Sequence, residues 1–162
     1  MNTQMISDKL NVTLANAIVT YQKLHQYHWR VSGEQFFRLH EKFEELYDTF
    51  NQTLDDVAER ILTIGGEPVG TLAGALELAT ISEDDTVPSA NDMVSNTLYD
   101  LETQQSQIQG VIAAAEAEGD RGTVNLLDGI SDDLEKQMWM LRAYLRQNAG
   151  EATATSREKA VA

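Results

Sequence analysis

Long stretches of the chain carry apolar residues at every third or fourth position, and short stretches containing glycine or proline separate them. This spacing places apolar side chains on one face of an α-helix. The first stretch covers residues 7–30, and Gly33 follows it where a helix is expected to stop. Its apolar stripe consists of Leu10, Leu14, Ala17, Ile18, Tyr21 and Leu24.

Three further stretches have the same periodicity. The second covers residues 35–64 and is ended by Gly65 and Gly66, with Pro68 close behind. The third follows Pro88, and Ser89 and Asp92 have the spacing of a capping pair at its start. A break over residues 119–122 precedes the fourth, which covers residues 123–147. The pattern therefore predicts four long helices.

The connection between the second and third helices contains TLAGALELAT, residues 71–80, which predicts a short extra helix. A connection of this length suits a crossover between parallel helices, as in ferritin-like bundles. We therefore expect an all-α, ferritin-like four-helix bundle with a short helix in the crossover. Residues 1–148 form its single domain, and the small, polar residues 149–162 are expected to be a disordered tail.

Composition narrows the possible functions. The chain has 162 residues, no cysteine, and 12 Lys and Arg against 26 Asp and Glu, a formal charge of −14. The absence of cysteine excludes disulfides, thiolate zinc sites and a catalytic thiol. The negative charge disfavours nucleic acids and acidic membranes as partners and suits cations. Neither a membrane span nor a signal peptide is evident, so we expect a cytoplasmic protein.

Two pairs of potential metal ligands lie on the second predicted helix. His40 and Glu44 are four residues apart and share a face, and Asp55 and Glu59 repeat that spacing. His28 precedes them at the end of the first helix. Imidazole and carboxylate without thiolate is a ligand set for iron or another first-row divalent metal.

One chain alone does not bring both pairs to one metal. At a rise of 1.5 Å per residue, His40 and Asp55 lie about 22 Å apart along a helix. Either the pairs are unrelated, or they meet across a two-fold axis between antiparallel second helices, which creates two identical sites per dimer. The spacing permits both.

Simpler interpretations stay open. His40 with Glu44, and Asp55 with Glu59, also suit solvated helix surfaces, where Lys42 and Arg60 would neutralise the carboxylates. His28 beside Trp29 also suits packing at a helix end. His25 fits no motif, and we expect it to be structural or exposed.

The run HWRVSGEQFFRLHEKFEELYDTFNQTLDDVAERILTIGGEPVGTL, residues 28–72, resembles the signature of the Dps family, or miniferritins. The similarity in layout extends over residues 5–148. It implies a homo-oligomeric shell of twelve subunits, with ferroxidase sites between two-fold-related subunits. The implied iron ligands are His28, His40 and Glu44 of one chain, with Asp55 and Glu59 of the partner. Glu44 is a departure, because the family usually has Asp there.

The resemblance also implies oxidation of Fe(II) to Fe(III), preferably by hydrogen peroxide rather than dioxygen, and storage of ferric oxide in the shell. Trp29 corresponds to the tryptophan that takes up oxidising equivalents beside the site. Zn²⁺ is an expected competitor for iron. The implied acidic entry pore lies near the start of the last helix, where Arg121 and Asn125 weaken the pattern; its candidate residues are Glu116, Glu118, Asp120 and Asp128.

DNA binding in some members of this family uses a lysine-rich N-terminal arm. Here the first ten residues contain one lysine, Lys9, so we expect direct DNA binding to be absent unless cations bridge the two. DNA compaction is therefore the alternative function to iron oxidation. A structural or signalling bundle without chemistry is the third, and retention of all five ligand-type residues argues against it.

Overall fold

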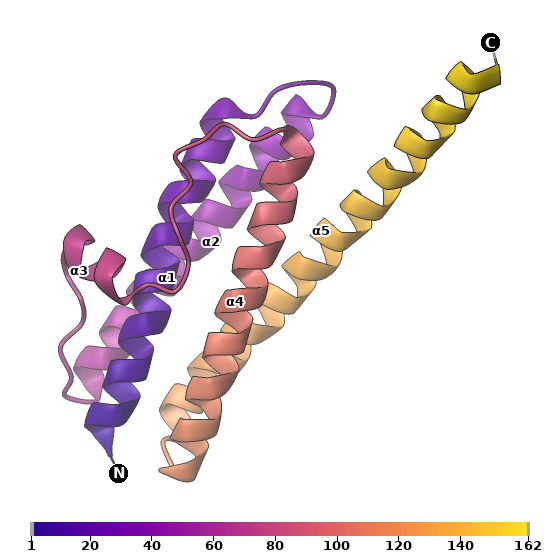
Figure 1. Ribbon diagram of the computed structural model, residues 1–162. Helices are drawn as coiled ribbons and strands as arrows, with labels where there is room; N and C mark the ends of the chain where they lie inside the picture. Colours follow the sequence, from indigo (N-terminus) through magenta and orange to yellow (C-terminus); the bar gives the residue numbers. More distant parts are fainter. Residues whose placement is uncertain (1, 162) are drawn as a thin grey trace.

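A computed structural model describes the backbone of residues 2–161 and the side chains of residues 2–147. Over that range the chain is helical without strands, and its helices are α1 (Thr3–Arg30), α2 (Phe36–Thr63), α3 (Leu72–Leu78), α4 (Ala90–Ala117) and α5 (Arg121–Val161). Four of them are long and form the bundle (Figure 1). Within the described residues, no helix combines the length and the low polarity that a membrane span requires.

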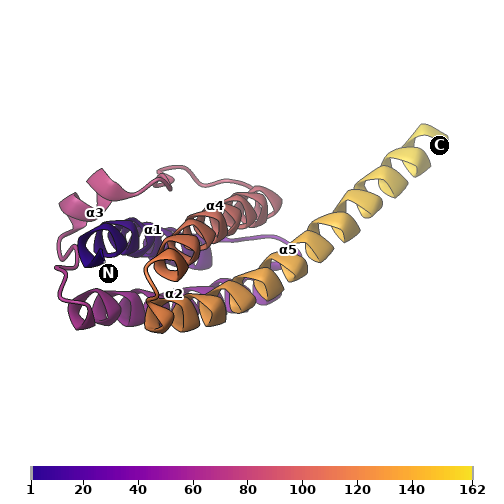
Figure 2. The same cartoon turned by 90° about the horizontal axis from the view of Figure 1, so that it is seen from below.

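The bundle consists of two antiparallel hairpins, α1 with α2 and α4 with α5 (Figure 1). The segment between the hairpins carries α3 along the outside of α1 and returns the chain to the end of the bundle where α2 began (Figures 1 and 2). As a result, α2 and α4 run in the same direction. The predicted ferritin-like bundle with a crossover helix is confirmed.

All four long helices contribute apolar side chains to a common core, and some stripe residues, such as Ile18 and Tyr21, pack against it while only half-buried. The core consists of large side chains that are almost fully excluded from solvent, and every long helix contributes to it. Representative members are Leu10, Leu14 and Leu24 of α1, Phe43, Leu46 and Phe50 of α2, Leu101 and Ile108 of α4, and Leu134, Met138 and Leu141 of α5.

Two asparagines of α1 hold the crossover in place. Asn11 donates to the carbonyl oxygen of Glu67 (2.9 Å) and accepts from the amide of Val69 (2.7 Å). Asn16 accepts from the amide of Thr80 at 2.7 Å and from that of Ile81 at 3.2 Å. These amides have no helical partner, so the asparagines provide the backbone groups of the crossover with hydrogen-bond partners. Periodicity alone did not indicate this role.

Two helix starts can be compared with the starts that the sequence predicts. Ser89 accepts from the amide of Asp92 at 3.2 Å, as predicted, and its hydroxyl donates to the Asp92 carboxylate at 2.6 Å. The last helix starts at Arg121, two residues earlier than predicted. The reason is Asp120, which caps it by accepting from the amide of Thr123 at 3.1 Å.

The helix α5 is longer than the pattern predicts. Its backbone is helical as far as Val161, past the domain boundary that we placed at residue 148. The distal part projects away from the other helices (Figures 1 and 2). Side chains from residue 148 onward lie outside the described residues, and the disordered tail stays a prediction.

Candidate metal centre

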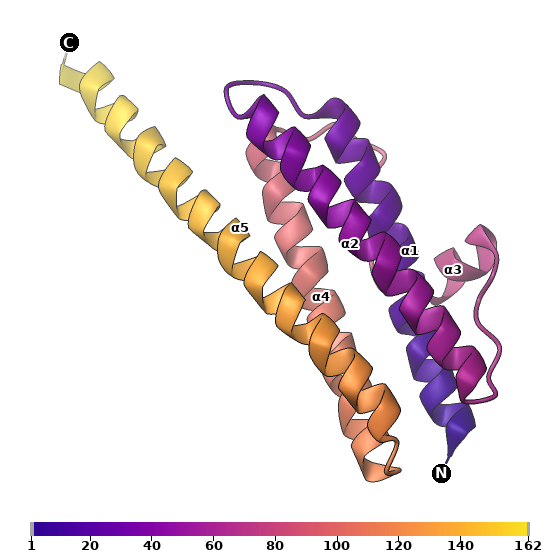
Figure 3. The same ribbon diagram turned by 180° about the vertical axis from the view of Figure 1, so that it is seen from behind.

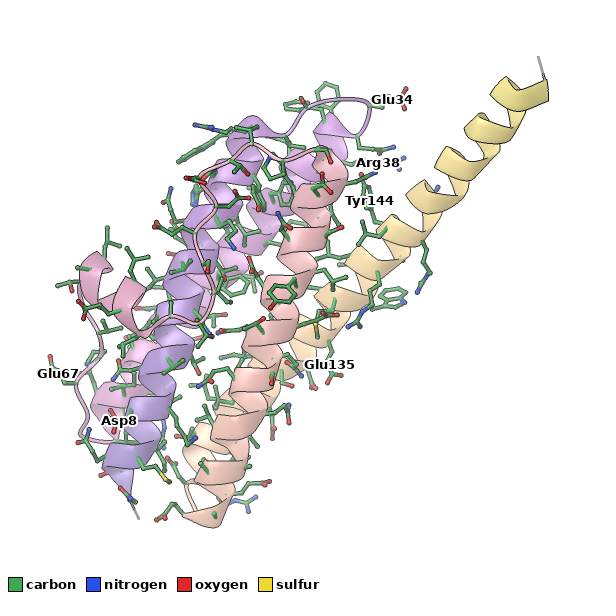
Figure 4. The ribbon with its side chains drawn as sticks, in the orientation of Figure 1. Asp8, Glu34, Arg38, Glu67, Glu135 and Tyr144 are labelled. Atoms are coloured by element: carbon green, nitrogen blue, oxygen red, sulfur yellow. The ribbon has the colours of Figure 1, made fainter. Side chains whose placement is uncertain are left out.

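A tight turn brings the end of α1 next to the start of α2. The amide of Val31 donates to the carbonyl oxygen of Tyr27 at 2.8 Å, where α1 ends. The amide of Phe36 donates to the carbonyl oxygen of Gly33 at 3.0 Å. Gly33 has a φ of +100°, which L-residues with a side chain rarely adopt. Glu34 and Arg38 point outward at this end of the bundle (Figure 4). The turn therefore places His28 opposite His40.

His28, His40 and Glu44 form a compact group of potential metal ligands. One ligand atom from each residue lies within 4.8 Å of the others. Both rings are half-buried and stack on each other, with centroids 3.7 Å apart and an interplanar angle of 19°. The four-residue spacing thus places His40 and Glu44 on one face of α2, as predicted. The turn brings His28 next to them.

Each histidine is oriented by the backbone of the other. Nδ1 of His28 lies 2.8 Å from the carbonyl oxygen of His40, and Nδ1 of His40 lies 2.8 Å from that of His28. A carbonyl oxygen only accepts, so both Nδ1 atoms carry the hydrogen and donate it. Both Nε2 atoms keep a free lone pair, the arrangement that metal-binding histidines adopt.

Aromatic rings surround the two histidines. Phe36 stacks on His40 at 5.1 Å, and the edge of Tyr47 faces His28 at 5.4 Å. Burial and the negative charge of Glu44 raise the pKa of the Tyr47 hydroxyl. Tyr47 lies three residues after Glu44 on α2, a spacing that places both side chains on one face of the helix.

His25 and Trp29 lie on the outer side of this aromatic group. His25 stacks on Tyr47 with centroids 3.8 Å apart, and Trp29 lies 5.5 Å from His25. Trp29 is 62% exposed on the single chain. His25 is half-buried and contacts three aromatic rings, in agreement with a structural role.

Comparison with known proteins decides the family. A family model for the ferritin-like domain matches residues 7–149. The chain is 44% identical over 142 residues to the DNA protection during starvation protein of Brevibacillus brevis, covering 88% of this chain and 95% of that protein. The crystal structure of a Dps protein from Bacillus brevis superposes with a TM-score of 0.87 at 43% identity, over 88% of this chain and 96% of that one. The chain belongs to the Dps family.

Two further Dps structures resemble this one closely. The protein from Vibrio cholerae O1, described as a member of a broad superfamily of ferritin-like diiron-carboxylate proteins, gives a TM-score of 0.86 at 34% identity, covering 88% of this chain and 90% of that one. Dps from Listeria innocua, studied after soaking with zinc, gives a TM-score of 0.84 at 35% identity, covering 86% of this chain and 95% of that one. The predicted family and fold are both confirmed.

Asp55 and Glu59 are not part of the His28 group within one Dps chain. Both lie on α2 with exposed side chains, more than two turns beyond Glu44. The rise of a helix places Asp55 about 22 Å from His40. Their predicted role in a metal site therefore depends on a second chain.

The basic residues that would neutralise these carboxylates are engaged elsewhere. Lys42 pairs with Glu45 at 2.8 Å. Arg60 pairs with Asp120 and also donates to the hydroxyl of Thr123 at 2.9 Å. Glu44 therefore faces the histidines without Lys42 as a counter-ion, which leaves its negative charge for a cation.

The residues considered for an entry pore divide into two groups. Glu116 and Asp128 are exposed and line a hollow of about 520 Å³ together with Arg121 and Asn125. Asp120 is buried beneath Arg60, and Glu118 accepts from the amide of Asn2 at 2.6 Å. Asp120 thus serves as a helix cap and is unsuited to lining a pore.

Proposed function

We propose that this Dps chain is a ferroxidase that oxidises Fe(II) to Fe(III), with hydrogen peroxide as the preferred oxidant. The observation that carries the proposal is the group of His28, His40 and Glu44, in which one ligand atom of each residue lies within 4.8 Å of the others. The carbonyl contacts of both Nδ1 atoms leave the two Nε2 atoms available for a metal. Imidazole nitrogen suits Fe(II), and the hard carboxylate oxygen favours the Fe(III) product.

A complete site needs ligands from a second chain in this proposal. Asp55 and Glu59 of the partner subunit would face His40 and Glu44 across a two-fold axis, because antiparallel α2 helices align the opposite ends. Their exposure on the single chain supports this arrangement, since a ligand given to a partner must be accessible. Twelve such chains would close into a shell that stores ferric oxide.

Two irons bound together would allow peroxide to be reduced by two electrons at once. Two Fe(II) ions deliver two electrons to one peroxide, whose O–O bond breaks, and two protons complete two water molecules. No one-electron step then releases hydroxyl radical. Trp29 lies next to the group through His25 and is the proposed acceptor of oxidising equivalents when only one iron is bound. Cytoplasmic localisation stays a prediction.

Iron oxidation tests the proposal directly. Fe(II) oxidation by hydrogen peroxide is followed for the parent, His28→Ala, His40→Ala and Asp55→Ala/Glu59→Ala, with Glu41→Gln as a control on an exposed neighbour of His40. We expect the three ligand variants to lose at least about tenfold in rate, the loss typical of disturbed metal sites. Parent-like rates in all three would show that the ligand assignment is wrong.

DNA compaction is the competing function, since relatives carry the name DNA protection during starvation protein. The formal charge of −14 opposes binding to a phosphate backbone. A gel shift at low salt separates the two functions: we expect no shift without Mg²⁺. A magnesium-free shift would favour DNA compaction.

A further inference from the structure

The three ligand side chains of the His28 group are not held in the same way. The backbone fixes both imidazoles, because Nδ1 of His28 and Nδ1 of His40 each donate to a carbonyl oxygen at 2.8 Å. Glu44 is exposed, and its carboxylate stands on a longer and more rotatable stem than an imidazole ring. Lys42 does not hold it, since that lysine pairs with Glu45. Another group must therefore orient the carboxylate.

The hydroxyl of Tyr47 reaches this carboxylate. Tyr47 follows Glu44 by three residues on α2, so the two side chains are neighbours on the helix surface. The hydroxyl and the carboxylate form a hydrogen bond, in which the hydroxyl donates because an ionised carboxylate only accepts. Burial and the charge of Glu44 raise the pKa of the hydroxyl, so it keeps the proton that it donates at neutral pH.

The ring of Tyr47 is itself held by three rings of α1, which lies alongside α2 (Figure 3). His25 stacks on it with centroids 3.8 Å apart. The ring of His28 meets it edge-on at 5.4 Å, and that of Tyr21 does so at 6.2 Å. Because these rings come from different turns of α1, the position of Tyr47 does not depend on one contact alone. Its hydroxyl is therefore held in place relative to His28.

We propose that Tyr47 is a positioning residue, which holds the Glu44 carboxylate in the orientation that binds metal beside His28 and His40. The inference rests on the proposed function, because Glu44 must be an iron ligand for its orientation to matter. Carboxylates that bind metals are themselves commonly held by hydrogen bonds from surrounding groups. A carboxylate oriented in advance also loses less conformational freedom when the metal arrives.

Metal affinity tests this role without iron oxidation. Co²⁺ alone is the probe, because it binds nitrogen and oxygen ligands as Fe(II) does, and its visible absorption reports the geometry of those ligands. Tyr47→Phe removes the hydroxyl and keeps the ring. We expect it to lower the affinity for Co²⁺ by about tenfold and to change the spectrum of the bound ion. The matched control is Tyr21→Phe, which removes a hydroxyl from a ring that contacts Tyr47 and His25. It should behave like the parent.

A double-mutant cycle separates positioning from a general structural role. Tyr47→Phe is also made in a Glu44→Ala chain, where there is no carboxylate to orient. A residue that acts through Glu44 should then have no further effect on the affinity for Co²⁺. An equal loss in both backgrounds would overturn the proposal, and so would parent-like affinity and spectrum in Tyr47→Phe.

The variant His28→Ala, measured in parallel, distinguishes this inference from the proposed function. Parent-like binding of Co²⁺ by His28→Ala would refute the ligand group and the role of Tyr47 together. Weakened binding by His28→Ala, combined with equal losses for Tyr47→Phe in both backgrounds, would refute the role of Tyr47 alone. We expect His28→Ala to weaken binding and the effect of Tyr47→Phe to disappear with Glu44.

Discussion

Nδ1 of His28 and Nδ1 of His40 each donate to the main-chain carbonyl of the other residue, at 2.8 Å in both directions. The two bonds fix the tautomer and tilt of both rings before any metal arrives. Both Nε2 atoms are then left free to bind a metal beside Glu44, whose carboxylate belongs to the same group. Such preorganisation reduces the conformational entropy that metal binding must overcome.

Replacing one member of this pair should weaken metal binding sharply. His40→Gln removes an Nε2 ligand and also releases His28 from one of its two bonds. We expect the affinity for Zn²⁺, measured by isothermal titration calorimetry, to fall by at least about tenfold. The control is His25→Gln, which alters a neighbouring ring outside the ligand group and should keep an affinity close to that of the parent. Equal losses in both variants would contradict the assignment.

The turn between α1 and α2 should depend on Gly33. Its φ of +100° is strained for a residue with a Cβ atom, although nothing lies within 4 Å of that position. We expect Gly33→Ala to lower the free energy of unfolding by about 1–2 kcal/mol, measured by urea denaturation. Gly110→Ala is the matched control: it lies in open space within α4 and should stabilise the protein by about 0.5–1 kcal/mol. Stabilisation by both changes would refute the role of the turn.

A buried ion pair joins α1 to α4 and leads to a third prediction. Lys23 and Asp100 are 2.7 Å apart, and both side chains are less than one-tenth exposed. Lys23→Met leaves Asp100 buried without a counter-ion, which should cost about 3–5 kcal/mol. The double variant Lys23→Met/Asp100→Leu should recover most of that loss. If the double variant were less stable than Lys23→Met, the desolvation argument would fail.

Burial raises the pKa of Asp100 above its usual 3.8, although Lys23 opposes the shift. The folded chain therefore holds this proton more tightly than the unfolded chain. The contribution of this carboxyl to stability is present below pH 3.8 and is lost as the pH rises through the folded pKa.

Asp120 has the opposite dependence on pH. Burial alone would raise its pKa, but hydrogen bonds from Thr123 and the charge of Arg60 together outweigh that effect and lower it below 3.8. Its stabilising contribution is therefore present above pH 3.8 and is lost as the pH falls through the lower folded pKa. Asp120→Asn should flatten the decline of the melting temperature below pH 4. A decline as steep as that of the parent would contradict the prediction.

Helix periodicity was enough to predict the bundle, because each stripe must be buried and only a crossover connects parallel helices. The shared face of His40 and Glu44 followed from their spacing for the same reason. The interlocked carbonyls of His28 and His40 could not be predicted, since they depend on how the turn at Gly33 sets one helix against the other. The contact between the rings of Tyr47 and His28 could not be predicted either, since it depends on the same turn.

The role of Asp55 and Glu59 is a different case, because the geometry of one chain leaves it undetermined. It rests on the relation between two copies.

Anaerobic soaking of crystals with Fe(II), followed by anomalous diffraction at the iron edge, tests the central claim most directly. The account predicts iron bonded to Nε2 of both His28 and His40 and to the Glu44 carboxylate, with Asp55 and Glu59 of the partner subunit completing the site. Iron bound elsewhere, with no contact to His28 or His40, would contradict it.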